Sequence, residues 1–163
     1  MEKDINQLNI RLLVKEDRDK IDAFFRGLGE EGEGFFNINR DNEKNVYAFL
    51  DGELQDRIYW AAVAEADEGE EIAGIVFLWD ISKKIPWLGI GITEKWKGRH
   101  LGRRLMAVAK EYAGVACAGG ICLTTSQKNL RGQGLYERMG YERLGVHLNG
   151  EFLYLLTFPN EEK

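Results

Sequence analysis

Several features are scarce or absent in this sequence of 163 residues, and each absence excludes a class of protein. Only two cysteines, Cys117 and Cys122, are present, too few for a disulfide scaffold or a four-ligand zinc site, so we expect no metal site. The longest strongly apolar run, residues 72–79, is far shorter than the roughly 20 residues that span a membrane. No apolar stretch follows the first residues, so we expect no secretory signal. The simplest interpretation is a reduced, cytoplasmic protein whose thiols pack in the core.

A basic excess is also missing, because the formal net charge is −5, which argues against a general nucleic-acid binder. Apolar residues make up 44% and charged residues 30% of the chain, a composition typical of a single globular domain over residues 1–163. The charge is unevenly distributed. Residues 83–104 hold seven Lys or Arg and one acid, whereas residues 65–71 hold five acids and no base. The basic segment indicates one anionic ligand bound there, and a solvated face that binds nothing is the alternative.

The apolar pattern predicts hairpin strands first, then strands alternating with helices, then a closing hairpin. The expected elements in chain order are a strand at 10–14, a helix capped by Asp17 and reaching Leu28, a short helix at 45–50, strands at 57–64, 71–79 and 87–92, a helix at 103–113, a strand at 121–125, a helix at 129–139 and strands at 141–148 and 151–158. A strand–helix–strand connection places its two strands parallel. We therefore expect an α/β (α+β) fold: a mixed, mostly antiparallel seven-stranded sheet with a central parallel pair, flanked by helices.

Two glycine-containing stretches predict breaks in this pattern. Residues 27–34 hold four glycines, which weaken any helix or strand, so we expect a mobile loop. Asn149-Gly150 separates the last two strands and is typical of a two-residue hairpin turn.

The segment from Gly89 to Met106 carries the strongest chemical signal, because a strand, a glycine-containing loop and a helix follow one another. Amides at a helix start have no partner inside the helix, and the helix dipole adds positive charge there. Gly98 and Gly102 let the backbone approach a ligand closely. The segment therefore predicts a phosphate site, with basic side chains from Lys97, Arg99, Arg103 and Arg104.

Three kinds of phosphate loop compete for this segment. The Walker pattern is absent, and the dinucleotide pattern that Gly89-Ile-Gly91 begins is broken by Glu94 at its last position. Residues 97–102, Lys-Gly-Arg-His-Leu-Gly, resemble the acetyl-CoA loop Arg/Gln-x-x-Gly-x-Gly/Ala of the Gcn5-related N-acetyltransferases (GNAT family). They depart from it at Lys97, where Arg or Gln is usual, and at His100, where Gly is usual. If the backbone at His100 has positive φ, its side chain costs about 1 kcal/mol.

A second motif makes the resemblance specific. The family shows Asn, a small residue three places on, then Leu-Tyr and then Gly-Phe/Tyr. Residues 129–141, Asn-Leu-Arg-Gly-Gln-Gly-Leu-Tyr-Glu-Arg-Met-Gly-Tyr, are similar throughout, with Gly132 at the small position. The resemblance covers about residues 10–158, and its motifs lie between Gly89 and Tyr141. Glycines inside a helix cost about 1 kcal/mol each relative to Ala, and close approach of a bound cofactor would give a reason for them.

The resemblance implies transfer of an acetyl group from acetyl-CoA to a primary amine of a small molecule or a protein. The pantetheine arm of coenzyme A would lie between the two central parallel strands, which splay apart. The cofactor-binding residues expected from the family are Ile90, Ile92, Lys97, Gly98, Arg99, His100, Gly102, Arg103, Asn129 and Tyr136. Tyr136 would also be catalytic and protonate the leaving thiolate, and an amide near Ile92 would stabilise the oxyanion. No serine or cysteine nucleophile is needed.

The general base stays open. Many relatives carry a glutamate near the position of Trp87, which cannot act as a base. Glu94, His100, His147, Glu151 and a water relay are the alternatives. A non-catalytic acyl-CoA sensor, or a nucleotide-binding fold of another type, are rival functions.

The acceptor and the assembly stay open as well. The acceptor pocket is expected in the N-terminal half, where two groups of residues are candidates to line it or to attract a cation: Phe35, Phe36, Tyr47 and Phe49, and Glu30, Glu31 and Glu33. We expect no nucleic-acid or membrane partner, and a homodimer is one possible assembly.

Overall fold

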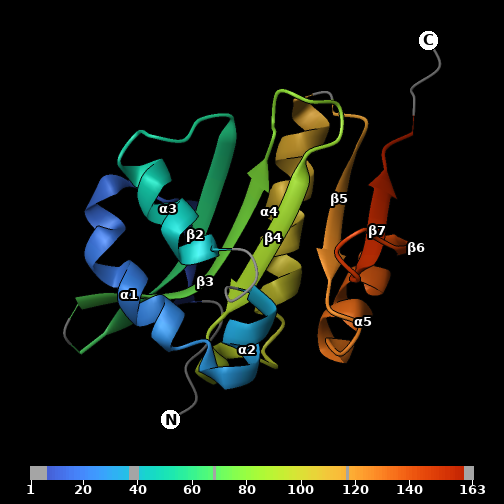
Figure 1. The fold of residues 1–163 in the computed structure, drawn as a ribbon. Coiled ribbons are helices and arrows are strands. Elements are labelled where there is room, and N and C mark those ends of the chain that lie inside the picture. Colours follow the sequence, from blue (N-terminus) through green and yellow to red (C-terminus); the bar gives the residue numbers. More distant parts are fainter. Residues whose placement is uncertain (1–6, 37–40, 68, 117, 160–163) are drawn as a thin grey trace.

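The computed structural model describes residues 7–36, 41–67, 69–116 and 118–159, and one seven-stranded sheet runs through it (Figure 1). The strand order is β1-β2-β3-β4-β5-β7-β6. Every neighbouring pair is antiparallel except β4 and β5, which are parallel. The strand bounds are β1 Asn9–Leu12, β2 Arg57–Ala66, β3 Gly69–Trp79, β4 Trp87–Ile92, β5 Gly120–Thr125, β6 Glu142–Val146 and β7 Phe152–Thr157. The mixed sheet with one central parallel pair is therefore confirmed.

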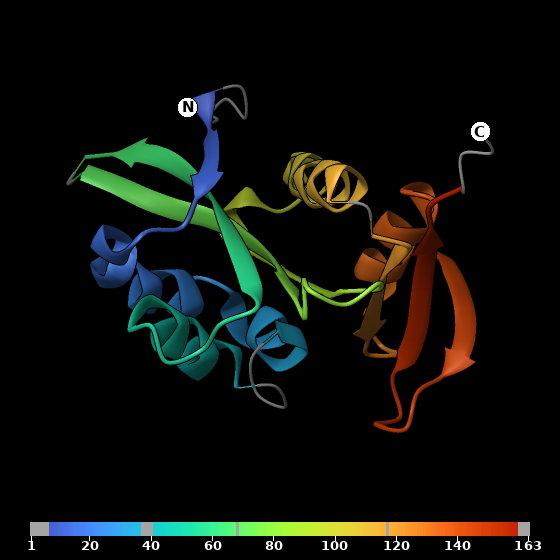
Figure 2. The ribbon, with the colours of Figure 1, turned by 90° about the horizontal axis from the view of Figure 1, so that it is seen from above.

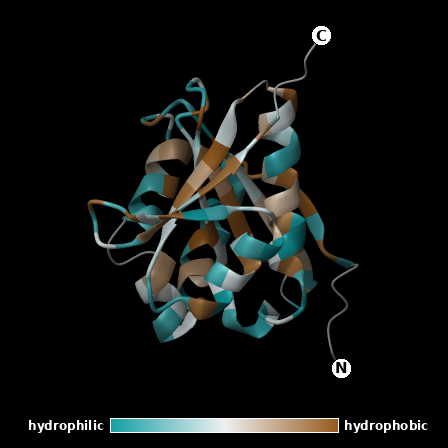
Figure 3. Cartoon of the chain, turned by 90° about the vertical axis from the view of Figure 1, so that its right-hand side faces the viewer, coloured by the Kyte–Doolittle hydropathy of each residue, from teal (hydrophilic) through white to brown (hydrophobic). Residues whose placement is uncertain are grey.

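Helices cover both faces of this sheet (Figure 2). Their bounds are α1 Arg18–Arg26, α2 Gly29–Phe36, α3 Asn42–Leu50, α4 Leu101–Val115 and α5 Leu130–Arg138, with short 3-10 turns η2 Lys15–Asp17 and η3 Glu94–Trp96. One apolar cluster joins α1, α2 and α3 to one face, and a second joins α4 and α5 to the other. Figure 3 shows the matching pattern, with hydrophobic residues along the strands and hydrophilic ones on the outer turns of helices. No helix among the described residues is long and apolar enough to cross a membrane.

The prediction of a loop over residues 27–34 is wrong, because residues 29–36 form α2. Gly29 has a φ of 76° and turns the chain between α1 and α2. Leu28 directly precedes α2 and Phe36 is its last residue, and both are buried in the apolar cluster of α1–α3. Tertiary burial of these two side chains offsets the poor helix propensity of the glycines.

The two-residue turn at Asn149-Gly150 is also wrong. The last ladder contact of the hairpin is between His147 and Glu151, and the Gly150 amide donates to the His147 carbonyl oxygen. Asn149 does not have positive φ, whereas Gly150 has a φ of 85°. A two-residue type I′ turn needs positive φ at both residues, so the chain forms a three-residue loop with only its glycine left-handed.

A buried carboxylate ties β1 to the start of α1. Asp17 accepts hydrogen bonds from both Arg11 guanidinium nitrogens at 2.8 Å and from the Val14 amide at 2.9 Å. Burial acts to raise the pKa of the Asp17 carboxyl, but these hydrogen bonds and the charges of Arg11 and Lys20 outweigh it and lower the pKa to about 2. An ionised Asp17, in addition to apolar packing, therefore holds β1 against the start of α1.

Candidate active site between the split strands

The central parallel strands are joined at one end only. Trp87 and Cys122 form the single register pair between β4 and β5, and the Cys122 amide donates to the Pro86 carbonyl oxygen at 3.0 Å. Beyond this point the strands diverge, as Figure 1 shows. A cavity of about 770 Å³ lies along the split and is lined by residues from β3, β4, β5, α2, α4 and α5. The splay expected between these strands is therefore present.

The backbone of β4 is unpaired on the side of this split. The Thr93 amide donates to the Ala73 carbonyl oxygen at 2.9 Å, in register with the Ile75–Gly91 pair. Backbone groups of an antiparallel strand alternate in direction from one residue to the next. The amide and carbonyl groups of Ile90 and Ile92 therefore point away from β3, toward β5 and the cavity.

The backbone of the basic loop is shaped by two left-handed residues. Gly98 has a φ of 75° and His100 a φ of 65°. His100 therefore adopts the positive-φ conformation, in which its side chain costs about 1 kcal/mol. Helix α4 starts directly after it, so the first amides of α4 lack partners within the helix. Gly102 is buried there, and a Cβ on it would lie 2.8 Å from Cδ2 of Leu135.

Basic side chains gather at this end of the cavity. Of the predicted basic residues, Lys97, His100 and Arg103 line it, whereas the side chains of Arg104 and Arg99 do not. Arg104 instead donates to the Leu8 carbonyl oxygen at 3.4 Å. The Arg99 guanidinium lies over the Trp96 ring, 5.3 Å from its centroid. Two further basic residues, Arg131 and Arg138 of α5, line the cavity and were missed. The sequence signal was their position next to the motif glycines, on the helix that follows Asn129.

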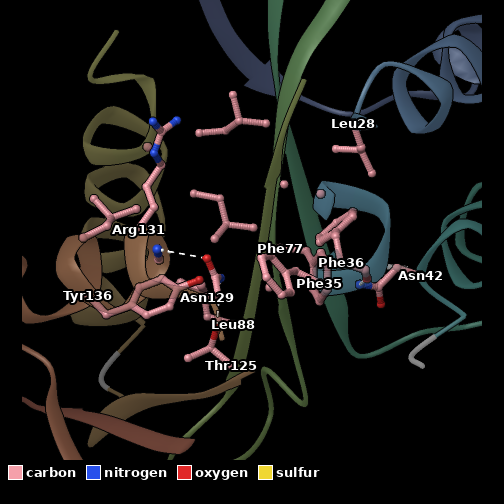
Figure 4. Close-up of a pocket in the computed structure, with 18 of the residues that line it drawn as sticks. Leu28, Phe35, Phe36, Asn42, Phe77, Leu88, Thr125, Asn129, Arg131 and Tyr136 are labelled. Carbon is pink, nitrogen blue, oxygen red and sulfur yellow. Dashed lines mark hydrogen bonds between the residues drawn. The ribbon is translucent and has the colours of Figure 1, made fainter. Parts of the chain in front are cut away.

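Helix α5 presents the second motif to the cavity (Figure 4). Asn129 caps the helix: its Oδ1 accepts from the Gly132 amide at 3.1 Å, and its Nδ2 donates to Thr125 Oγ1 at 3.0 Å. A Cβ on Gly132 would lie 2.4 Å from the Asn129 Nδ2, so the cap itself requires a glycine. Tyr136 lines the cavity and is 7% exposed.

The structure separates the candidate bases. His147 and His100 line the cavity, whereas Glu94 and Glu151 do not. Glu94 belongs to η3 rather than to a loop, and its carboxylate lies against Gly29. His147 packs edge-on against Trp87, with ring centroids 5.7 Å apart. His147 thus lies beside Trp87, near which the family resemblance implies a glutamate.

The candidate acceptor residues also divide. Phe35, Phe36 and Glu31 line the cavity. Tyr47 and Phe49 pack against the apolar cluster of α1–α3. Glu30 is exposed away from the cavity, and the side chain of Glu33 lies outside the described residues.

Cys122, the cysteine that the structure describes, does not line the cavity. Cys122 is buried beneath the β4–β5 junction, and burial raises the pKa of its thiol to about 11. A thiol that stays protonated near neutral pH is a packing group rather than an activated nucleophile. Cys117 lies outside the described residues.

Solved structures have a similar fold. The GNAT domain of S. lividans PAT has a TM-score of 0.77 at 15% identity, covering 93% of this chain and 90% of that one. PaiA N-acetyltransferase from Thermoplasma acidophilum, in complex with coenzyme A, has a TM-score of 0.72 at 15% identity, covering 93% and 99%. Spermidine N-acetyltransferase from Vibrio cholerae, in complex with CoA and spermine, has 0.70 at 16%, covering 92% and 94%. No curated protein sequence matches the chain.

The fold is thus that of the GNAT acetyltransferases, and two of these three neighbours were solved with coenzyme A. The sequence agrees, because residues 55–143 match the acetyltransferase (GNAT) domain. The chain belongs to the GNAT family, as the two motifs predicted.

Proposed function

We propose that this protein transfers an acetyl group from acetyl-CoA to the nitrogen of a primary amine. The single observation that carries the proposal is the split between β4 and β5, where the unpaired backbone of Ile90 and Ile92 meets the amides that open α4. A linear amide-containing molecule can pair with a free strand edge as an additional strand. The Vibrio cholerae neighbour is a spermidine N-acetyltransferase, which supports an amine as the acceptor.

The residues present fit coenzyme A. Free amides at the α4 start and the left-handed turn at His100 form a concave donor set suited to the pyrophosphate. Lys97, Arg103, Arg131 and Arg138 add positive charge on the cavity wall. Acetyl-CoA would supply the acetyl group as a thioester. Ile90 and Ile92 would hold the pantetheine arm through their backbone groups, with Asn129 at its flank.

Two groups of the chain then assist the transfer. The Ile92 amide points into the split and would donate to the thioester carbonyl oxygen as negative charge grows on it. The Tyr136 hydroxyl would donate its proton to the sulfur as the carbon–sulfur bond breaks and the carbon–nitrogen bond forms. Tyr136 is held for this role by ring contacts with Tyr141 and Tyr154, at 6.3 and 5.8 Å between centroids.

His147 is the base that the geometry favours. An ammonium ion must lose a proton before its nitrogen can attack, and imidazole accepts protons near neutral pH. His100 lies in the phosphate loop, whereas His147 lies at Trp87 on β4. His147 would therefore take the proton that the amine releases, directly or through one water.

The proposal is tested by following free thiol release from acetyl-CoA with a panel of primary amines. We expect turnover in the wild type and a kcat at least about 100-fold lower in Tyr136→Phe, since a missing general acid typically costs that much. Tyr112→Phe is the matched control, because Tyr112 packs on Trp60 outside the cavity. Binding of coenzyme A without turnover on any amine would identify a sensor instead. Competition by ATP at the same site would indicate another nucleotide-binding function.

A further inference from the structure

Among the described residues, two buried polar atoms on residues that line the cavity lack a hydrogen-bond partner: Nε1 of Trp96, a donor, and Oδ1 of Asn42, an acceptor. Asn42, the first residue of α3, is 1% exposed and lines the cavity. Its Nδ2 donates to the Phe36 carbonyl oxygen. Among the described residues, no donor reaches its Oδ1. A buried carbonyl oxygen without a hydrogen bond is costly, so this atom is a strong acceptor for a donor group on a ligand.

Aromatic rings separate Asn42 from β4. In Figure 4, Phe35, Phe36 and Phe77 lie between the Asn42 side chain and that strand. The Phe36 and Phe77 ring centroids are 6.1 Å apart, and Phe77 stacks on Trp79 at 4.8 Å. All four aromatic residues line the cavity. This side of the cavity therefore favours an apolar body, and flat rings suit it best.

Two glycines bring these rings onto the backbone of β4. A Cβ on Gly91 would lie 2.9 Å from the Phe36 ring, and a Cβ on Gly89 would lie 2.1 Å from the Phe77 ring. Gly89 and Gly91 alternate with the residues whose backbone faces the split. The aromatic wall thus begins beside the place where the acetyl group would be transferred.

Acidic side chains mark this side of the cavity. Glu31 of α2 and Asp80, which follows β3, both line it. A carboxylate attracts an ammonium group and repels a carboxylate on the ligand. An amine is therefore favoured over an acid or an amino acid as the occupant.

The geometry points to an aryl-bearing small primary amine as the acceptor, with a hydrogen-bond donor on the ring at the end away from the amine. This inference rests on the proposed acetyl transfer. The ring would lie against Phe36 and Phe77, its donor would reach Asn42 Oδ1, and the amine would point at β4. Asn42 would then be a specificity residue for a phenol-type hydroxyl.

Tyramine and 2-phenylethylamine test the inference, since they differ only by that hydroxyl. We expect the wild type to prefer tyramine in kcat/KM by about tenfold or more, because an unsatisfied polar group discriminates strongly. Asn42→Leu should bring the ratio near one and leave the KM for acetyl-CoA unchanged. Asn45→Leu is the matched control on the same helix, and its asparagine lies outside the cavity; this variant should keep the preference.

Each outcome has a defined meaning. A wild-type ratio near one, or faster turnover of hexylamine or an aliphatic polyamine, overturns the inference without touching acetyl transfer. If no amine is acetylated, the proposed function fails. In that case the inference is decided by calorimetric titration of both amines into the wild-type protein saturated with coenzyme A. Tighter binding of tyramine supports the Asn42 contact, and equal or absent binding overturns it. The wild-type comparison also stands if Asn42→Leu fails to fold.

Discussion

Strand β4 has a different kind of cavity surface on each side. Toward α4 and α5, the surface consists of backbone donors and basic side chains that come from two short segments, residues 97–103 and 129–138. Toward α2 and α3, it consists of aromatic and polar side chains from α2, α3 and β3, which are far apart in the sequence. The first surface suits a ligand shared by a whole family. The second surface is made of side chains, so substitutions of these residues in the N-terminal half change its shape and chemistry.

The largest effect is expected from breaking the backbone surface with Gly102→Glu. The new side chain meets Leu135, since even a Cβ would lie 2.8 Å from its Cδ2, and it places negative charge at the start of α4. Loss of two charge-assisted hydrogen bonds alone is worth several kcal/mol. We expect the Kd for coenzyme A, measured by calorimetry, to rise about 1000-fold.

Gly114→Glu supplies the control for this change. Gly114 lies on the same helix, and a Cβ on it would meet nothing within 4 Å. It adds the same charge far from the loop, so affinity for coenzyme A should stay within about twofold. Unchanged affinity in a folded Gly102→Glu protein would be incompatible with a pyrophosphate site at this turn.

These two surfaces also differ in how far the sequence predicts them. The backbone surface depends on glycine and asparagine at fixed spacing, so its position follows from a motif. Lys97, Gly98, His100, Gly102, Asn129 and Tyr136 all line the cavity as expected. Arg99 does not, because a motif fixes the path of the backbone and not the direction of a long side chain.

The aromatic surface was harder to predict. Asn42 and Asp80 gave no local signal, since they join the cavity only through the packing of α3 and the end of β3. Helix α2 was missed for a related reason: four glycines predict a loop, and only burial of Leu28 and Phe36 holds them in a helix. The strands themselves, in contrast, follow from apolar runs bounded by polar segments, and the parallel pair follows from the strand–helix–strand connection.

The next largest effect is expected at His147, which lies where the two surfaces meet. His147→Gln should lower kcat about 100-fold, because glutamine keeps the polarity but accepts no proton near pH 7. The Kd for coenzyme A should not change, since His147 packs on Trp87 and not on the basic loop. Added imidazole should restore part of the rate. A kcat within twofold of the wild type would exclude His147 as the base.

A third prediction concerns Asp17, which joins β1 to the start of α1. Asp17→Asn removes the charge that Arg11 and Lys20 surround. The pKa of this carboxyl falls from 3.8 to about 2 on folding, which corresponds to about 2 kcal/mol of stability at neutral pH. Urea unfolding should show that loss in the variant.

The pH dependence of this effect has a definite sign. Because folding lowers the pKa of Asp17, its contribution is complete above about pH 4 and is lost as the pH falls toward 2. The wild type and Asp17→Asn should therefore converge in stability over this interval. Asp19→Asn, which changes an exposed carboxylate in the first turn of α1, should lose far less at pH 7. A constant gap between wild type and Asp17→Asn from pH 7 to pH 2 would assign the effect to packing.

The smallest effect separates backbone from side chain within the basic loop itself. His100 holds a φ of 65°, a conformation that costs a residue with a side chain about 1–2 kcal/mol. Glycine removes this cost but gives the unfolded chain more freedom, worth about 0.5–1 kcal/mol. His100→Gly should therefore raise the free energy of unfolding by at most about 1.5 kcal/mol. Because the amide stays in place, affinity for coenzyme A should change less than about threefold. A tenfold loss would show that the imidazole, and not the main chain, contacts the phosphates, and the contrast between the two sides of β4 would then be one of position rather than of chemistry.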